Sequence, residues 1–226
     1  MYTAVLIEPR KHKALEFCIN NLLDNLNSDW NILVFHSDEN QEYLSNIVKS
    51  SRVTLLNNIQ NMNGDDYNKL LTSSSFYDSI PTDLFLITQT DAMIIPKNKD
   101  KISEFLEYDY VGAPWNTPGF FLHNLVGNGG FSLRRKSKML DILKTVPYET
   151  WINEDVYFSM NTQNKPSFEK AELFSSETKW NPNSFGIHCV WKYIPNMSDI
   201  IQLIELNREY RPLKDAQPSQ VQPLVP

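Results

Sequence analysis

Residues 126–158 contain the glycines and acids with the clearest chemical potential in this sequence. Three of the seven glycines of the chain lie there within four residues: Gly127, Gly129 and Gly130. Glycines let a ligand approach the backbone closely and adopt backbone angles that other residues avoid. Two adjacent acids, Glu154 and Asp155, follow among hydrophobic residues, where partial desolvation suits proton transfer. A turn followed by a helix with acids in its first turn would explain either feature alone, and their combination favours a site.

A third carboxylate, Asp91, comes just after residues 84–87, the most hydrophobic run of the chain. A buried carboxylate is unfavourable unless a cation or hydrogen bonds compensate it. Asp91 is therefore either a ligand of a divalent metal or an acceptor for the amides of a turn. His188 lies among hydrophobic residues near the other end of the chain, where a histidine is more often a core residue than a ligand.

Further candidates follow other short apolar runs. Arg10 and His36 would lie at the carboxyl ends of strands, where parallel sheets bind their ligands. Residues 108–115 combine small and aromatic side chains, including Tyr110 and Trp115. This segment would form either a wall for a polar ring ligand or a surface loop.

Regular elements must bring these side chains together. Apolar runs predict strands at 4–7, 32–36, 53–56 and 84–87, and helical spacing predicts helices at 15–26, 44–48 and 67–76. The alternation predicts an α/β fold, one Rossmann-like domain with a mostly parallel mixed sheet flanked by helices. Further helices are expected at 100–106 and 199–207. We assign residues 1–211 to the domain and the proline-rich residues 212–226 to a tail or linker.

Composition narrows the possible functions. A net charge of −6 over 226 residues argues against nucleic-acid binding, and a phosphorylated ligand would need a local arginine or metal ion. No apolar run approaches the roughly 20 residues that span a bilayer, so no membrane segment is expected. The N-terminus does not resemble a signal peptide, and we expect a cytoplasmic protein or a domain of a larger one. The two cysteines, Cys18 and Cys189, form no zinc motif.

Taken in order, these motifs resemble the metal-dependent glycosyltransferases of the GT-A fold. The chain is similar in particular to an uncharacterised family of glycosyltransferase-like domains that carries E-P-R, Q-T-D, Y-D-Y-x-G-A-P-W, G-N-G-G-F-S-L-R and E-D-V. These motifs run from Glu8 to Trp191 and leave out little more than the expected tail. The proline-arginine turn resembles the β-1,4-galactosyltransferases, and the glycine-rich strand, helix and E-D-V resemble the β-1,3-galactosyltransferases.

The resemblance implies transfer of a sugar from a nucleotide-diphosphate sugar to a hydroxyl of a glycan or other acceptor, with inversion at the anomeric carbon. It implies Asp155 as the general base, Glu154 as a residue that orients a substrate, and Asp91 with His188 as ligands of Mn²⁺ or Mg²⁺. Contacts to the donor are expected from Pro9, Arg10, His36, Gln89, Gly129 and Gly130. Contacts to the sugars or the diphosphate are expected from Tyr110, Trp115 and Arg134.

One departure from the GT-A pattern keeps other functions open. The usual D-x-D metal motif is replaced by Gln89-Thr90-Asp91, which lacks the first carboxylate. Gln89 retains the ability to bond a ribose hydroxyl but adds no charge to a metal site. An inactive sugar- or nucleotide-binding domain is therefore the main alternative. A nucleotidyltransferase ranks last, because the segment after the first strand has no glycine-rich loop.

Overall fold

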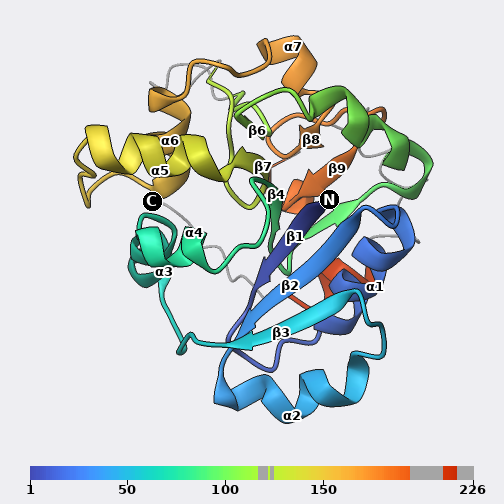
Figure 1. Ribbon diagram of the computed structural model, residues 1–226. Coiled ribbons are helices and arrows are strands. Elements are labelled where there is room, and N and C mark those ends of the chain that lie inside the picture. The colour runs from blue at the N-terminus through green and yellow to red at the C-terminus, as the bar shows by residue number, and fades with distance from the viewer. Residues whose placement is uncertain (117–121, 123–124, 194–210, 218–226) are drawn as a thin grey trace, which may run out of the picture.

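The computed structural model describes residues 1–116, 122, 125–193 and 211–217, and Figure 1 shows its ribbon. Its main sheet has six strands in the order β3-β2-β1-β4-β7-β6. Their bounds are β1 Tyr2–Ile7, β2 Trp30–His36, β3 Val53–Asn57, β4 Leu84–Thr88, β6 Tyr110–Gly112 and β7 Phe131–Arg135. The first four strands in chain order are parallel, whereas β7 runs antiparallel to both β4 and β6. The predicted α/β fold with a mostly parallel mixed sheet is confirmed.

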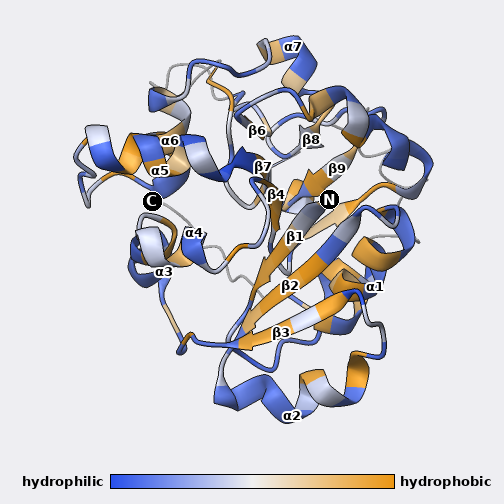
Figure 2. Cartoon of the chain, viewed as in Figure 1, coloured by the Kyte–Doolittle hydropathy of each residue, from blue (hydrophilic) through white to orange (hydrophobic). Residues whose placement is uncertain are grey.

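The central strand β1 is buried on both faces. Ala4 and Leu6 belong to one core cluster, whereas Val5 and Ile7 belong to a second cluster. Because successive side chains of a strand point to opposite faces, the two clusters lie on opposite sides of the sheet. Figure 2 shows the parallel strands β1, β2 and β4 as mostly hydrophobic and α2 as mostly hydrophilic. Such continuous hydrophobic runs are typical of parallel strands that are covered on both sides.

Helices cover both faces. The first cluster includes side chains of α1, Leu15–Asn25, and of α2, Asp38–Ile47. The second includes side chains of α3 Gly64–Leu71, α4 Ser74–Asp78, α5 Lys136–Thr145 and α6 Glu154–Asn161. Two short helices, α7 Phe168–Ala171 and α8 Val190–Tyr193, lie later in the chain. The structure thus has three layers, with the main sheet in the middle (Figure 1).

A second, three-stranded sheet determines where the metal candidates lie. It has the order β5-β9-β8, with β5 at Ala92–Ile94, β8 at Ser175–Ser176 and β9 at Gly186–His188. The antiparallel pair β5–β9 places Ala92 opposite His188. Asp91, which directly precedes β5, is therefore brought beside the end of β9.

Two predicted helices differ in form. The one predicted at 67–76 is divided into α3 and α4 at Thr72 and Ser73, whose hydroxyl groups donate to carbonyl oxygens of the preceding turn. The one predicted at 100–106 is part of a 3-10 helix, η1, that spans Pro96–Phe105.

The beginning of the expected tail is packed on the domain. Residues 211–215 are helical. Leu213 is fully buried in the first core cluster, and the side-chain amide of Gln217 donates to the carbonyl oxygen of Thr90. The buried leucine packs this segment, where the expected tail begins, against the folded body. The helix predicted at 199–207 and residues 218–226 lie outside the described residues. Within the described ranges, no helix is both long and apolar enough to cross a bilayer.

Candidate functional site

A cleft of about 850 Å³ opens at the carboxyl ends of β1 and β4, beside the start of α3. Parallel sheets commonly bind ligands at this edge. The cleft is lined by residues that follow these strands and by later parts of the chain, including Glu8, Pro9, Arg10, Asn63, Tyr67, Gln89, Thr90, Asp91, Trp191, Lys192 and Gln217. Four of the predicted site residues, Pro9, Arg10, Gln89 and Asp91, therefore lie along one cleft.

Arg10 presents a fixed positive charge in this cleft. Its Nε and Nη2 atoms each lie 2.8 Å from an oxygen of Glu8, which is buried. The hydroxyl of Thr90 donates to the same carboxylate over 3.3 Å. The two-point contact with Glu8 orients the guanidinium, while half of the Arg10 side chain remains exposed. Arg10 can therefore bind an anionic group in an otherwise acidic protein.

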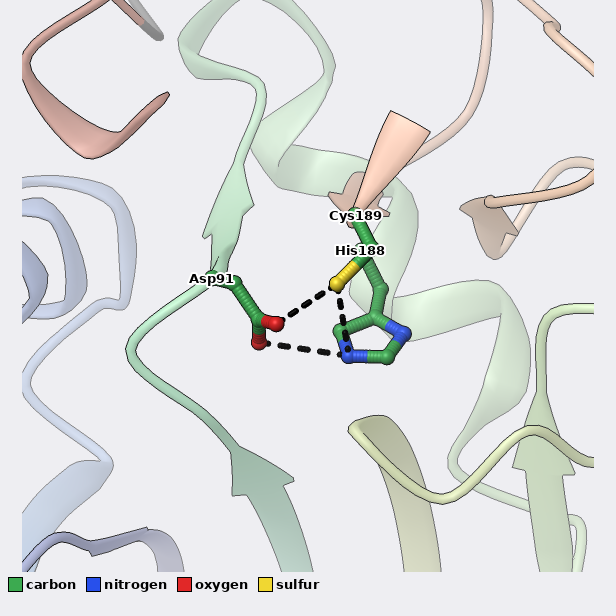
Figure 3. Close-up of side chains that lie close together, drawn as sticks. All are labelled: Asp91, His188 and Cys189. Carbon is green, nitrogen blue, oxygen red and sulfur yellow. Dashed lines mark hydrogen bonds and ion pairs between the residues drawn. The ribbon is translucent and has the colours of Figure 1, made fainter. Parts of the chain in front are cut away.

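Asp91, His188 and Cys189 form a compact group, here called the Asp91 cluster (Figure 3). His188 Nε2 lies 3.2 Å from Asp91 Oδ1 and 3.5 Å from Cys189 Sγ, which lies 2.6 Å from Asp91 Oδ2. The contact between Nε2 and Oδ1 lacks hydrogen-bond geometry, and this buried oxygen has no hydrogen-bond partner among the described residues. Oxygen, nitrogen and sulfur donors together with an oxygen free to coordinate fit a divalent cation.

The charges of the cluster depend on each other. Burial raises the pKa of Asp91, but His188, Cys189 and Lys192 together more than offset this, so the pKa of the carboxyl is lowered from its ordinary value. Burial lowers the pKa of His188, whereas Asp91 and then Cys189 raise it more, so the pKa of the imidazole lies well above its ordinary value. A cation bound by both side chains would replace the proton on His188 Nε2.

Glu177 contacts the second ring nitrogen of His188, and Asn128 contacts Glu177. His188 Nδ1 lies 3.1 Å from Oε1 of the buried Glu177, and Asn128 donates to the same oxygen over 2.7 Å. The Asn128 side chain also accepts from the backbone N–H of Gly130 over 3.0 Å. A carboxylate at one nitrogen of a histidine orients the other nitrogen toward a metal.

Gly129 and Gly130 connect the Asp91 cluster to the acidic pair. A Cβ atom at position 130 would overlap the imidazole of His188, and one at position 129 would lie 2.5 Å from Glu154 Oε1. We expected these glycines to leave space for a sugar. In this structure they leave space for protein side chains, so the two adjacent residues lie between His188 and the start of α6.

The pKa of the Asp155 carboxyl group is shifted from its ordinary value. Its Oδ2 accepts from the backbone N–H of Gly129 over 3.0 Å, and its Oδ1 accepts from that of Val156 over 2.8 Å. Burial and then the charge of Glu154 raise the pKa of Asp155 to about 7. A carboxyl group with this pKa exchanges protons readily near neutral pH. Asp155 does not line the 850 Å³ cleft.

Glu154 and Arg134 form a buried ion pair. Arg134 Nη1 and Nη2 lie 2.6 and 3.0 Å from the two oxygens of Glu154, and both side chains are almost completely buried. The guanidinium also lies 5.0 Å from the ring centre of Tyr110. The Tyr110 hydroxyl, in turn, donates to the carbonyl oxygen of Gly127 over 2.7 Å. The charges of Arg134 and Glu154 and the hydroxyl of Tyr110 therefore all have partners within the protein.

Two comparisons place the chain among known proteins. The family described as a protein of unknown function (DUF5672) matches residues 51–188, from just before β3 to the end of β9. The chain belongs to the DUF5672 family. No curated protein matches its sequence.

Solved structures share the fold of this DUF5672 chain. The glycosyltransferase GlyE of Streptococcus pneumoniae TIGR4 matches with 15% identity and a TM-score of 0.56, over 97% of this chain and 65% of GlyE. S. aureus TarS matches with 9% identity and a TM-score of 0.50, over 95% of this chain and 42% of TarS. The DUF5672 chain therefore has a glycosyltransferase-like fold and spans about two thirds of the length of GlyE.

Several residues of the DUF5672 chain that were predicted to contact substrate lie outside the cleft wall. Tyr110 and Arg134 are fully buried, and both oxygens of Glu154 are occupied by Arg134, because a buried guanidinium requires a charged partner. His36 is also buried, with Nδ1 3.0 Å from the carbonyl oxygen of Ser37, and it does not line the cleft. Trp115 is 8% exposed and is likewise absent from the cleft wall.

The sequence interpretation also missed three residues of the site. Cys189 was noted only for lacking a zinc motif, although its position directly after His188 was a signal. Glu177 and Asn128 gave no such signal, because the contact of Glu177 with His188 and that of Asn128 with Glu177 arise from the packing of distant segments.

Proposed function

We propose that this chain is a metal-dependent glycosyltransferase that moves a sugar from a nucleoside-diphosphate sugar to an acceptor hydroxyl with inversion. The observation that carries this proposal is the contact of His188 with Asp91, which lines a cleft that has Arg10 on its wall. The glycosyltransferase-like fold supports the proposal. In this proposal His188, at the end of β9, supplies the metal ligand that the missing first acid of the D-x-D motif would have provided.

The donor would bind with its diphosphate toward Asp91 and Arg10. Asp91 and His188 would hold Mn²⁺ or Mg²⁺, which supplies positive charge to the leaving diphosphate. The guanidinium of Arg10, fixed by Glu8, would bind a phosphate oxygen from the cleft wall. Gln89, which also lines the cleft, would bond a hydroxyl of the ribose.

Asp155 would act on the acceptor. Its carboxylate accepts the proton of the acceptor hydroxyl while the new glycosidic bond forms and the bond to the diphosphate breaks. A single displacement of this kind inverts the anomeric carbon. The pKa of about 7 makes Asp155 a stronger base than an ordinary aspartate and leaves much of it ionised at neutral pH. Glu154 contributes through its charge, and Arg134 is a positioning residue that holds Glu154.

Binding of a nucleoside diphosphate tests the donor site. Calorimetry with Mn²⁺ should detect binding to the unmodified protein, and Asp91→Asn should abolish its metal dependence, because an amide does not replace the charge that a hard cation requires. Asp24→Asn is a matched control, because Asp24 is exposed on α1. Equal metal-dependent affinity in Asp91→Asn would remove Asp91 from the site.

A panel of nucleotide sugars, with and without Mn²⁺, tests turnover. Donor hydrolysis or transfer to a simple saccharide is the expected result. Metal-dependent donor binding without transfer or hydrolysis for any sugar would favour the inactive sugar- or nucleotide-binding domain.

A further inference from the structure

The Asp91 cluster contains a sulfur atom that the proposed mechanism does not use. Cys189 Sγ lies 3.5 Å from His188 Nε2 and 2.6 Å from Asp91 Oδ2, and Figure 3 shows the three side chains directed toward one another. We propose that Cys189 is a third ligand, and that the site prefers a thiolate-binding cation such as Zn²⁺ or Co²⁺ to Mg²⁺. This inference rests on the metal site of the proposed function and specifies its chemistry.

The two donor-atom separations from His188 Nε2 fit a small tetrahedral ion. At ordinary zinc–ligand lengths, a tetrahedral site separates nitrogen from oxygen by about 3.4 Å and nitrogen from sulfur by about 3.6 Å. The corresponding distances here are 3.2 Å, from His188 Nε2 to Asp91 Oδ1, and 3.5 Å, from Nε2 to Cys189 Sγ. Oδ1 is also the carboxylate oxygen without a hydrogen bond among the described residues.

The backbone holds Cys189 in place. Its φ of 50° lies in the left-handed region, which a residue with a side chain rarely adopts. Its N–H donates to the carbonyl oxygen of Asp91 over 3.0 Å. Glycine would adopt this conformation more easily, so a cysteine here indicates that its side chain is needed. The same hydrogen bond holds the backbone of Cys189 beside that of Asp91.

Ligand chemistry determines the preference. Mg²⁺ binds oxygen atoms and retains several waters, whereas zinc and its first-row neighbours accept mixtures of carboxylate, imidazole and thiolate. Glu177 already orients His188 so that Nε2 faces the cluster. If Cys189 served only as a hydrogen-bond donor to Asp91, its replacement by serine would leave the order of metal affinities unchanged.

Cobalt provides a direct spectroscopic test. A Co²⁺ ion bound by a thiolate shows a sulfur-to-metal charge-transfer band in the near ultraviolet, which needs no enzymatic activity. The band is expected in the unmodified protein and in Cys18→Ala, since Cys18 is the other cysteine of the chain. Cys189→Ser should lose the band, and its Zn²⁺ affinity in competition calorimetry should fall at least about tenfold relative to its Mg²⁺ affinity.

Cys189→Gly is a second test in case Cys189→Ser does not fold. It removes the sulfur while relieving the left-handed backbone, so it should fold as well as the unmodified protein and still lack the band. Co²⁺ binding to the unmodified protein without the band would overturn the role of Cys189 and leave the proposed glycosyltransferase standing. Absence of Co²⁺ and Zn²⁺ binding would also overturn it, and metal-independent sugar transfer would separately contradict the proposed function.

Discussion

At the scale of single residues, protonation of Asp155 links stability to the proposed chemistry. Burial and the nearby Glu154 raise its pKa to about 7. The folded protein is more stable when Asp155 is protonated. Only the ionised form of Asp155, however, can accept a proton from an acceptor hydroxyl. The side chain is therefore least favourable for folding at the pH at which it is most useful as a base.

The rate of sugar transfer should follow this titration. We expect kcat to rise as the pH increases through about 7, because only the carboxylate accepts a proton. Asp155→Asn should lower kcat by about 10²- to 10⁴-fold and leave metal-dependent donor affinity unchanged. Steady-state kinetics across neutral pH, with Asp24→Asn as the control, measure both effects. Transfer at the unmodified rate in Asp155→Asn would assign the base to another residue.

Stability should change in the opposite direction. The folded pKa of about 7 lies above the unfolded value of about 3.9, so the favourable contribution of Asp155 is present below pH 4 and is lost as the pH rises through 7. Asp155→Asn should therefore gain about 1–3 kcal/mol relative to the unmodified protein between pH 5 and pH 8. Urea unfolding at both pH values measures this difference. A pH-independent difference would contradict the shifted pKa.

At the scale of elements, a buried ion pair joins β7 to α6. Arg134 comes from β7, beside the edge strand β6, and Glu154 from the first turn of the helix, and both side chains are buried. Asp155 follows Glu154 directly in the chain. The ion pair therefore fixes the start of α6, and with it the position of the proposed base.

Breaking this pair should destabilise the fold strongly. Arg134→Met or Glu154→Leu alone should lower the free energy of unfolding by about 3–5 kcal/mol, because each leaves a buried charge without its partner. The double variant should lose less than the sum of the two, since it leaves no unpaired charge. Urea unfolding of all four proteins completes the cycle. Additive losses would show that the two side chains act independently.

An added side-chain atom in the glycine-containing loop before β7 should weaken metal binding. Gly130→Ala would place a Cβ atom against the imidazole of His188 and should lower Co²⁺ affinity by displacing that ring. Gly64→Ala is the matched control, because nothing lies within 4 Å of its added Cβ. Cobalt titration compares the two variants. A Co²⁺ affinity of Gly130→Ala equal to that of the unmodified protein would show that His188 is not a metal ligand.

At the scale of the whole molecule, the segment 211–217 completes the domain. Leu213 packs into the core cluster beneath the main sheet, and Gln217 bonds to Thr90 at the cleft. A contact from near the end of the described chain thus supports both the core and the wall of the cleft. The folded unit extends at least to residue 217.

Removing the Leu213 side chain should therefore destabilise the entire domain. Leu213→Ala is expected to lower the free energy of unfolding by about 2–5 kcal/mol, because it creates a cavity in the core. Arg211→Ala, which changes an exposed residue of the same segment, should have little effect. Thermal unfolding measures both, at about 2–4 °C per kcal/mol for a chain of this size. A melting temperature unchanged by Leu213→Ala would mean that the segment is not part of the core.

Local patterns were sufficient for much of the fold and only part of the site. Apolar periodicity predicted the central strands and α1, because each pattern needs only neighbouring residues. It could not distinguish Arg134 from Arg135, whose side chains point to opposite faces of one strand. Arg134 is buried against Glu154, whereas Arg135 contacts Asp109 nearer the surface. The meeting of Asp91 with His188 depends on a strand pair distant in sequence, which local patterns do not predict.

The absence of space at Gly130 also restricts how this protein can evolve. Any larger residue at position 130 overlaps the ring of His188, so the two positions are not free to vary independently. In a library randomised at both, survivors with a side chain at position 130 should carry a smaller residue at position 188. Such survivors would also have lost an imidazole, so selection for folding and selection for metal binding should enrich different sequences.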